Sequence, residues 1–220
     1  MSTLSALREE CAQVSAALGQ IEDAEFEGPT RCSEWSVKEL LAHMYRDIDN
    51  IAIYLAHPEP DLATHDSITC WRDVPRMAAG IADRAKGSAA TFATAAALVD
   101  AWNALWPAVL DQVQAADPER LVTTWGPSMT LEEYLRTRVL EIVVHHMDLE
   151  DAFGRTCWGT DEAVGIVDEM LVDILGREPA HELDWDVIEF IERATGRKDL
   201  TAHERTLLGV RAAKRFPLIV

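Results

Sequence analysis

Apolar side chains recur at steps of three and four residues along most of this 220-residue chain, the spacing that places them on one face of a helix. Three such stretches cover residues 3–22, 37–55 and 131–154. Between them, the alanine-rich segment 75–116 is predicted as one long helix, with a break allowed near Gly87. Four long helices joined by loops predict an all-α, up-and-down four-helix bundle.

Capping residues mark where these helices begin and end. Three hydroxyl residues are each followed three positions later by glutamate, and such capping boxes satisfy free backbone amides at the start of a helix: Ser36 with Glu39, Thr130 with Glu133, and Thr201 with Glu204. Pro58 is expected to stop the second helix, and Gly154 the fourth. The segment 58–74 is predicted as a long loop, and loops of this length often border a site.

The pattern changes beyond Gly154. Shorter helices, separated by glycine and proline, are predicted at about residues 161–175, 186–194 and 202–214. No alternation of apolar and polar residues is strong enough there to predict a strand. We therefore expect a bundle over residues 1–155 and a helical C-terminal extension over residues 156–220 that packs on it.

The formal charge of −18 opposes binding to nucleic acid and to anionic membranes, because both carry negative phosphate groups. The N-terminal segment lacks the basic start and continuous apolar core of an export signal. The sequence also contains no uninterrupted run of about 18 apolar residues, the length needed to span a membrane. The cysteines lack the short spacing of a zinc knuckle or a redox motif: Cys11, Cys32, Cys70 and Cys157. These features predict a soluble, cytoplasmic protein with reduced thiols.

Polar residues of the fourth predicted helix gather on one face. Within a sector of roughly 80° lie Tyr134, Arg138, Glu141, His145 and Asp148. Apolar residues flank this stripe on both sides, so turning it toward water would expose one of the flanks. The stripe is therefore expected to face a cavity. Burying a carboxylate, an imidazole and a guanidinium together is costly unless their charges are paired or bound to an ion.

A divalent metal ion would satisfy this condition. Glu141 and His145 are four residues apart, so that one oxygen and one nitrogen can reach a common point. His43, in the middle of the apolar second helix, is the best candidate for a third ligand. One alternative is an ordinary hydrogen bond between Glu141 and His145, with Arg138 as the counter-charge. Another is that His43 pairs with Asp47, one turn later.

Two segments resemble the motifs of a known family. Residues 32–43, CSEWSVKELLAH, are similar to the opening motif of the mycothiol-dependent maleylpyruvate isomerase family, part of the wider DinB-like metalloprotein group. Residues 137–149, TRVLEIVVHHMDL, are similar to its second motif. In that family the histidine of the first motif and the glutamate and first histidine of the second bind a metal ion. The resemblance therefore implies the ligands His43, Glu141 and His145.

The resemblance covers about residues 1–155 and implies a DinB-like bundle. The tail also resembles actinobacterial members of the group, at residues 194–197 and 216–218. It shows no sign of the α/β C-terminal domain that the isomerase carries.

The resemblance also implies an enzyme that uses a low-molecular-weight thiol, mycothiol, for thiol transfer or thiol-assisted isomerisation of a small-molecule electrophile. Two imidazoles and a carboxylate leave zinc, the expected ion, with an open position typical of catalytic sites. Arg138 and Asp148 are the candidate catalytic residues, and together with Tyr134 they are the candidate cofactor-binding residues. Asp148 is expected to orient a ligand imidazole or bind the thiol, and Arg138 and Tyr134 to meet negative charge on the substrate.

Two other interpretations remain open from the sequence. The same metal site could activate a bound water, as in a metal-dependent hydrolase. The chain could also be a non-catalytic bundle that keeps the metal for stability or binds a small ligand. The electrophile is not indicated by any residue, and a homodimer is one arrangement that the sequence permits.

Overall fold

The structure, a computed structural model, describes residues 2–19, 21, 23–32, 35–72, 78–156, 158–179 and 181–219. Some residues used in the sequence analysis lie outside the described part: Ser33, Glu34, Pro75 and Cys157. Within the described part, the fold consists of helices and one short hairpin. The predicted all-α class is therefore confirmed.

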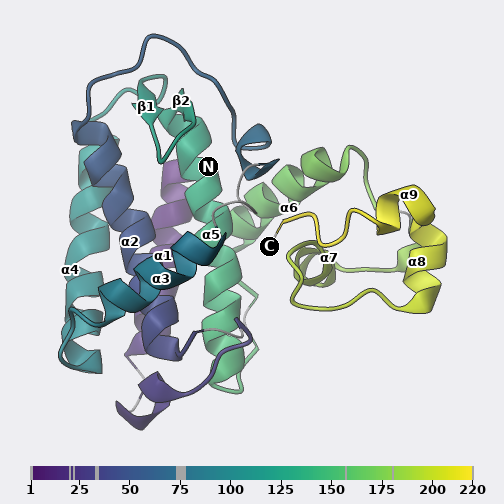
Figure 1. The fold of residues 1–220 in the computed structure, drawn as a ribbon, viewed down its shortest axis with the longest axis horizontal. Helices are drawn as coiled ribbons and strands as arrows, with labels where there is room; N and C mark the ends of the chain where they lie inside the picture. The colour runs from purple at the N-terminus through teal and green to yellow at the C-terminus, as the bar shows by residue number, and fades with distance from the viewer. Residues whose placement is uncertain are drawn as a thin grey trace.

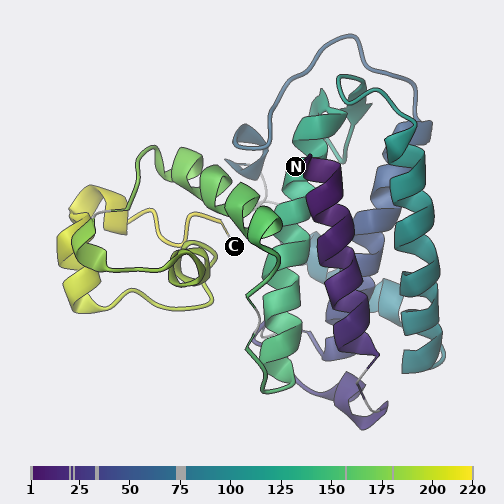
Figure 2. The same ribbon diagram turned by 180° about the vertical axis from the view of Figure 1, so that it is seen from behind.

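Four long helices form the bundle: α1 (Thr3–Leu18), α2 (Val37–Ala56), α4 (Ala95–Gln114) and α5 (Leu131–Ala152). Both α1 and α2 pack against α4 and against α5, and the two opposite views in Figures 1 and 2 show the four helices side by side. The core between them is fully buried and includes the indole of Trp102. This packing confirms the predicted four-helix bundle.

The prediction of one long helix over residues 75–116 is wrong. The segment forms α3 (Ala78–Ala89) and α4, and the break lies at residues 90–94, whereas Gly87 lies inside α3. Thr94 restarts the helix because its hydroxyl accepts a hydrogen bond of 3.1 Å from the backbone N–H of Ala97. As a result, α3 crosses over α2 instead of extending α4 (Figure 1).

Two of the predicted capping boxes are complete, at the starts of α2 and α8 (Ala202–Leu208). At the start of α5, the hydroxyl of Thr130 accepts from the backbone N–H of Glu133 at 3.2 Å. The carboxylate of Glu133 is engaged elsewhere, because it accepts from the backbone N–H of Ser67 at 2.7 Å. The box predicted for Thr130 and Glu133 is therefore incomplete, and Glu133 instead ties the long loop to the start of α5.

A short hairpin, which helical periodicity does not predict, precedes α5. Its strands β1 (Leu121–Thr123) and β2 (Ser128–Thr130) pair antiparallel. The loop after α2 runs along β2, because the backbone N–H groups of Thr64 and His65 both donate to the carbonyl of Ser128. Single turns of 3-10 helix complete these connections: η1 (Asp23–Glu27) after α1 and η2 (Thr69–Arg72) before α3.

The described part of the C-terminal extension consists of helices joined by loops, as predicted, and it extends to one side of the bundle in Figure 1. It contains α6 (Asp161–Leu175), η4 (His181–Leu183), α7 (Val187–Ala194), α8 and α9 (Val210–Ala213). The helix predicted over residues 202–214 is split at Gly209, whose φ of +78° interrupts it. Because α6 packs against α5 and α1, the extension rests on the bundle.

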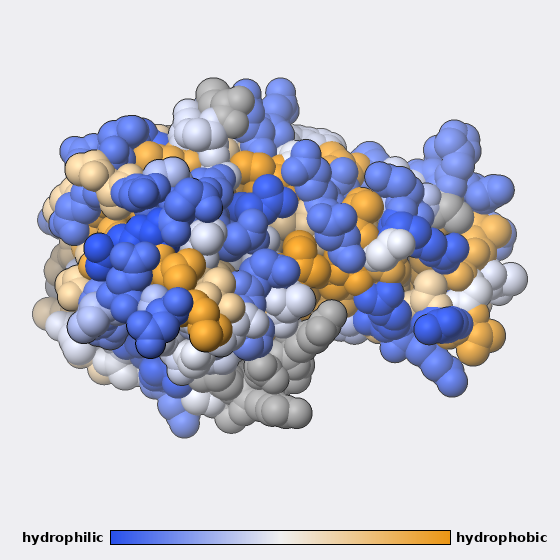
Figure 3. All heavy atoms as spheres, turned by 90° about the horizontal axis from the view of Figure 1, so that it is seen from above, coloured by the Kyte–Doolittle hydropathy of each residue, from blue (hydrophilic) through white to orange (hydrophobic). Residues whose placement is uncertain are grey.

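The surface is mostly hydrophilic on the face seen from above, with scattered hydrophobic patches (Figure 3). The high negative charge of the chain agrees with such a surface. None of the helices in the described part of the chain combines the length and the apolarity needed to cross a membrane.

Candidate metal centre

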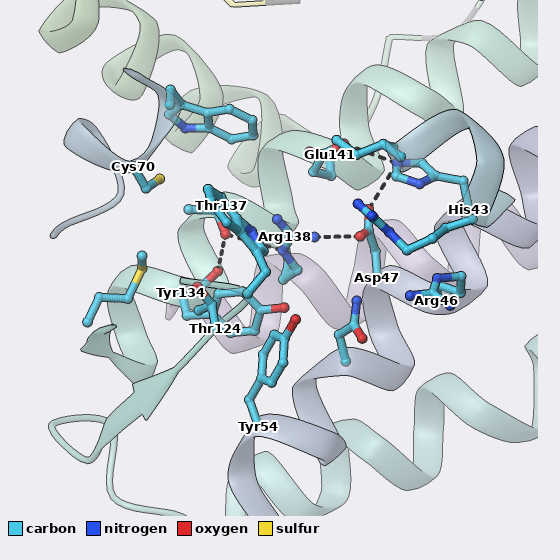
Figure 4. Close-up of a pocket in the computed structure, with 16 residues that line it drawn as sticks. His43, Arg46, Asp47, Tyr54, Cys70, Thr124, Tyr134, Thr137, Arg138 and Glu141 are labelled. Carbon is cyan, nitrogen blue, oxygen red and sulfur yellow. Dashed lines mark hydrogen bonds and ion pairs between the residues drawn. The ribbon is translucent and has the colours of Figure 1, made fainter. Parts of the chain in front are cut away.

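His43 of α2 and the pair Glu141 and His145 of α5 come together between the two helices (Figure 4 shows His43 and Glu141). Glu141 Oε2 lies 3.5 Å from His43 Nε2 and 3.2 Å from His145 Nε2. One possible ligand atom from each side chain lies within 4.8 Å of the other two. The three residues selected from the sequence therefore offer their donor atoms to one region of space.

The carboxylate of Glu141 is held in its ionised form, the form that binds a metal ion. Burial opposes its ionisation, but hydrogen bonds with His145 and His43 and the nearby charge of Arg138 keep the pKa well below its ordinary value. The side chains of the three candidate ligands are only 7–20% exposed. An anionic carboxylate and two imidazoles share a largely dry site, which favours binding of a cation.

Asp148 orients one of the two imidazoles. Its Oδ2 lies 3.0 Å from His145 Nδ1, and its carboxylate is fully buried. Burial opposes ionisation of Asp148, but hydrogen bonds with His145 and Arg197 hold its pKa far below the ordinary value. An ionised acceptor on Nδ1 favours the tautomer with the proton there, so that Nε2, which faces Glu141, is the nitrogen that would bind a metal ion.

The structure bears on the two alternatives to a metal site, a Glu141–His145 hydrogen bond with Arg138 as counter-charge and a His43–Asp47 pair. Glu141 does lie at pairing distance from His145, at 3.2 Å, but Arg138 is engaged by Asp47, to whose Oδ1 its Nη1 donates at 2.6 Å. His43 does pair with Asp47, at 3.3 Å, but through the same nitrogen that faces Glu141. Two carboxylates and two imidazole nitrogens around one region are a donor set that suits a divalent metal ion such as zinc.

A second group of possible ligands shares His145 and consists of Cys32, His145 and Asp148. Its carboxylate is already neutralised, because Arg31 Nε lies 2.9 Å and Arg197 Nη2 2.7 Å from the oxygens of Asp148. Two fixed guanidinium groups would repel a metal ion bound there. Electrostatics therefore favours the group formed by α2 and α5.

A cavity of about 400 Å³ opens beside the candidate ligands (Figure 4). Besides His43 and Glu141, it is lined by side chains of α2, α3, α5, the hairpin and the long loop: Arg46, Asp47, Asn50, Tyr54, Cys70, Trp71, Ile81, Arg84, Thr124, Trp125, Met129, Tyr134, Thr137 and Arg138. The predicted cavity along the polar stripe is confirmed for Tyr134, Arg138 and Glu141. His145 and Asp148 do not line it, so the stripe continues behind the cavity wall.

The ionisable groups in the cavity wall keep defined protonation states. Burial raises the pKa of Tyr134 far above its ordinary value, so that its phenol stays neutral. Burial would lower the pKa of Arg138, but the carboxylate of Asp47 raises it, so that the guanidinium stays charged. Burial raises the pKa of Cys70 to about 12, which leaves a neutral thiol.

Several groups around the centre are not indicated by helical periodicity or motif spacing. Trp35 packs its ring on both histidines of the candidate centre, with centroids 4.7 Å from His43 and 5.8 Å from His145. Its position within the first motif, residues 32–43, is the only sequence feature that points to a role at the centre. Periodicity and spacing do not indicate a role at the centre for Arg31 or for Arg197, which stands in the resembling segment 194–197, because their contacts to Asp148 span 117 and 49 residues of the chain.

Behind α5, His146 is buried and lies 2.7 Å from Glu10 of α1. Glu10 also accepts from the backbone N–H of Thr160, at the start of α6. The chain thus has two neighbouring histidines with different partners, and only His145 belongs to the candidate metal centre.

Solved structures of one enzyme have a similar fold. The crystal structure of the mycothiol-dependent maleylpyruvate isomerase is similar to this fold with a TM-score of 0.55 and 16% sequence identity, over 82% of this chain and 70% of that chain. A crystal structure of a histidine-to-alanine mutant of that isomerase gives the same TM-score and coverage at 15% identity. The matched part, 82% of this chain, is longer than the predicted bundle of residues 1–155. The likeness in fold therefore extends past residue 155.

Sequence comparison identifies the family. None of the curated proteins matches this chain significantly. A family model described as the mycothiol maleylpyruvate isomerase N-terminal domain matches residues 7–150, which is more than half of the sequence and includes all three candidate ligands. The chain therefore belongs to the family of the mycothiol maleylpyruvate isomerase N-terminal domain.

Proposed function

We propose that this protein is a metal-dependent enzyme that uses a low-molecular-weight thiol such as mycothiol to act on a small electrophile. The reaction is thiol transfer or thiol-assisted isomerisation. The observation that carries the proposal is the convergence of His43, Glu141 and His145 beside a cavity of about 400 Å³, whose wall includes His43 and Glu141. The family to which the chain belongs supports the choice of thiol.

The ligand set explains what a metal ion would contribute. His43 and His145 would each bind it through Nε2, and Glu141 through a carboxylate oxygen. Three protein ligands of this kind leave one position open on a tetrahedral zinc ion, as in catalytic zinc sites. A zinc ion supplies a Lewis acid that lowers the pKa of a bound thiol, so that a thiolate exists near neutral pH.

The other residues of the polar stripe act on the substrate and on the ligands. Arg138 presents a fixed positive charge to the cavity, because Asp47 holds its guanidinium from one side. The neutral phenol of Tyr134, whose ring centroid lies 5.0 Å from Arg138 Cζ, can donate a hydrogen bond. Both groups would stabilise negative charge that develops on the electrophile as the thiolate adds to it. Asp148 keeps His145 in the tautomer that binds the metal ion.

Thiol consumption tests this proposal directly. The zinc-loaded protein is mixed with mycothiol and a chromogenic aryl halide, and loss of free thiol is followed with and without removal of the metal by a chelator. We expect a rate above the uncatalysed reaction that disappears on chelation and in Glu141→Ala. Equal rates with and without the metal would contradict the proposal. Metal-dependent cleavage of an activated ester in the absence of thiol would favour a hydrolase instead.

A further inference from the structure

Two parts of the chain far from α5 in sequence converge on Asp148. Arg197, just after α7, donates from Nη2 to Asp148 Oδ2 at 2.7 Å and from Nε to Asp148 Oδ1 at 3.2 Å. Arg31, before α2, donates from Nε to Oδ1 at 2.9 Å. On its inner side, Asp148 Oδ2 lies 3.0 Å from His145 Nδ1. The fully buried Asp148 therefore links the C-terminal extension to a candidate metal ligand.

The guanidinium of Arg197 is itself fixed in place. Its Nη1 donates to the carbonyl of Thr195 at 2.8 Å. Gly196, directly before it, turns the chain with a φ of +75°, and an added Cβ there would lie 3.4 Å from Pro217. Arg31 is tied to the same segment, because its Nη1 donates to Glu192 of α7 at 2.9 Å. The extension thus presents Arg197 to Asp148 from a rigid turn.

We propose that Arg197 is a positioning residue for the metal centre, which acts through Asp148 on His145. Its two contacts hold the Asp148 carboxylate in one orientation, and this carboxylate in turn aims His145 so that Nε2 points toward Glu141 and His43. This inference rests on the proposed metal site. It gives the C-terminal extension a role in completing that site, which local sequence patterns do not indicate.

A direct and an indirect role of Arg197 predict opposite changes in metal affinity when this side chain is removed. A guanidinium that acted on the metal ion directly would repel it, so that loss of Arg197 would strengthen metal binding. A guanidinium that acts through Asp148 and His145 orders a ligand, so that its loss weakens metal binding. Loss of a group that orients a ligand in this way typically costs 10–100-fold in affinity.

The experiment measures binding of Co²⁺ to the metal-free full-length protein, by competition with a chromogenic chelator and by the visible absorption of bound Co²⁺. We expect Arg197→Ala to weaken binding by about tenfold or more and to change the spectrum. Lys198→Ala is the matched control, because Lys198 pairs with Glu189 at the surface, at 3.3 Å. This variant should leave both the Co²⁺ affinity and the spectrum unchanged. Asp148→Asn should weaken binding as well. The double variant Asp148→Asn with Arg197→Ala should be no weaker than Asp148→Asn alone.

Several results would overturn the inference: unchanged or tighter binding in Arg197→Ala, or losses that add in the double variant. If Arg197→Ala melts early, Arg197→Lys replaces it, since it keeps the charge but not the paired contacts. Weaker binding by a natively folded Arg197→Lys supports the role, and unchanged binding rejects it. Failure of the wild-type protein to bind Co²⁺ would reject the proposed function itself, which separates the two hypotheses.

Discussion

Each candidate imidazole ligand has a carboxylate beside it, and each of these carboxylates has an arginine. His43 lies 3.3 Å from Asp47, which Arg138 holds at 2.6 Å. His145 lies 3.0 Å from Asp148, which Arg197 holds at 2.7 Å and Arg31 at 2.9 Å. The negative charge next to each ligand is thus fixed by a second layer of positive charge. Breaking such a buried pair destabilises the fold, because loss of one partner leaves the other charge buried and unpaired.

The pair of Arg138 and Asp47 gives a stability prediction. Asp47→Asn leaves the buried guanidinium of Arg138 without a counter-charge, so the free energy of unfolding should fall by about 3 kcal/mol in urea denaturation. Asp111→Asn is the control, because Asp111 is 74% exposed and its pairing with Arg8 should contribute less than about 1 kcal/mol. Equal effects of the two substitutions would show that burial does not make the first pair important.

Helix boundaries follow local rules where a capping residue or a glycine decides them. The starts of α2 and α5 agree with their predicted caps, and α6 ends before Gly176 in the left-handed conformation. The break between α3 and α4 is expected near Gly87 but lies at residues 90–94, which contain neither glycine nor proline, whereas Gly87 and Pro107 lie inside helices. There, a hydroxyl cap at Thr94 and packing of α3 on α2 override the continuous helical periodicity.

The cap of α8 gives a prediction that depends on pH. Burial opposes ionisation of Glu204, but hydrogen bonds from Arg193, Thr201 and Trp185 lower its pKa to about 2, from 4.5 in the unfolded chain. A lowered carboxyl pKa stabilises the folded state above pH 4.5, and this stabilisation is lost as the pH falls toward 2. Glu204→Gln should therefore lower the free energy of unfolding by about 2 kcal/mol at pH 7.

Thermal melting at pH 7 and at pH 2 checks this effect. The difference in Tm between wild type and Glu204→Gln should be large at pH 7 and small at pH 2. Glu169→Gln serves as the control, since Glu169 is 71% exposed in its pairing with Arg136. A difference for Glu204→Gln that is the same at both pH values would contradict the assignment to the ionised carboxylate.

At the scale of the whole molecule, the sequence predicts the bundle and the three ligands but not how the extension reaches them. His43, Glu141 and His145 could be selected because each has a local pattern: mid-helix position, one-turn spacing and a polar stripe. The contact of Arg197 with Asp148 depends on how α6 and α7 pack against the bundle, and periodicity carries no information on that packing. The same holds for α3, whose Ile81 lines the cavity only because the helix crosses α2.

Metal binding should stabilise the whole fold, because the ligands come from two different helices of the bundle. At a free zinc concentration of 100 times Kd, the stabilisation is about 2.7 kcal/mol, and Tm should rise accordingly. Glu141→Ala should lose this rise, whereas His203→Ala, an exposed histidine of α8, should keep it. A rise of Tm in Glu141→Ala equal to that of the wild type would show that zinc binds elsewhere.

The most direct measurement is the metal content of the purified, untagged protein, determined by elemental analysis after reloading with zinc and removal of the excess. The wild-type protein should hold one zinc ion per chain. His43→Ala should hold much less, because it removes the one residue of the proposed trio that α2 supplies. One full equivalent of zinc in His43→Ala, or no bound metal in the wild type, would contradict the three-ligand centre.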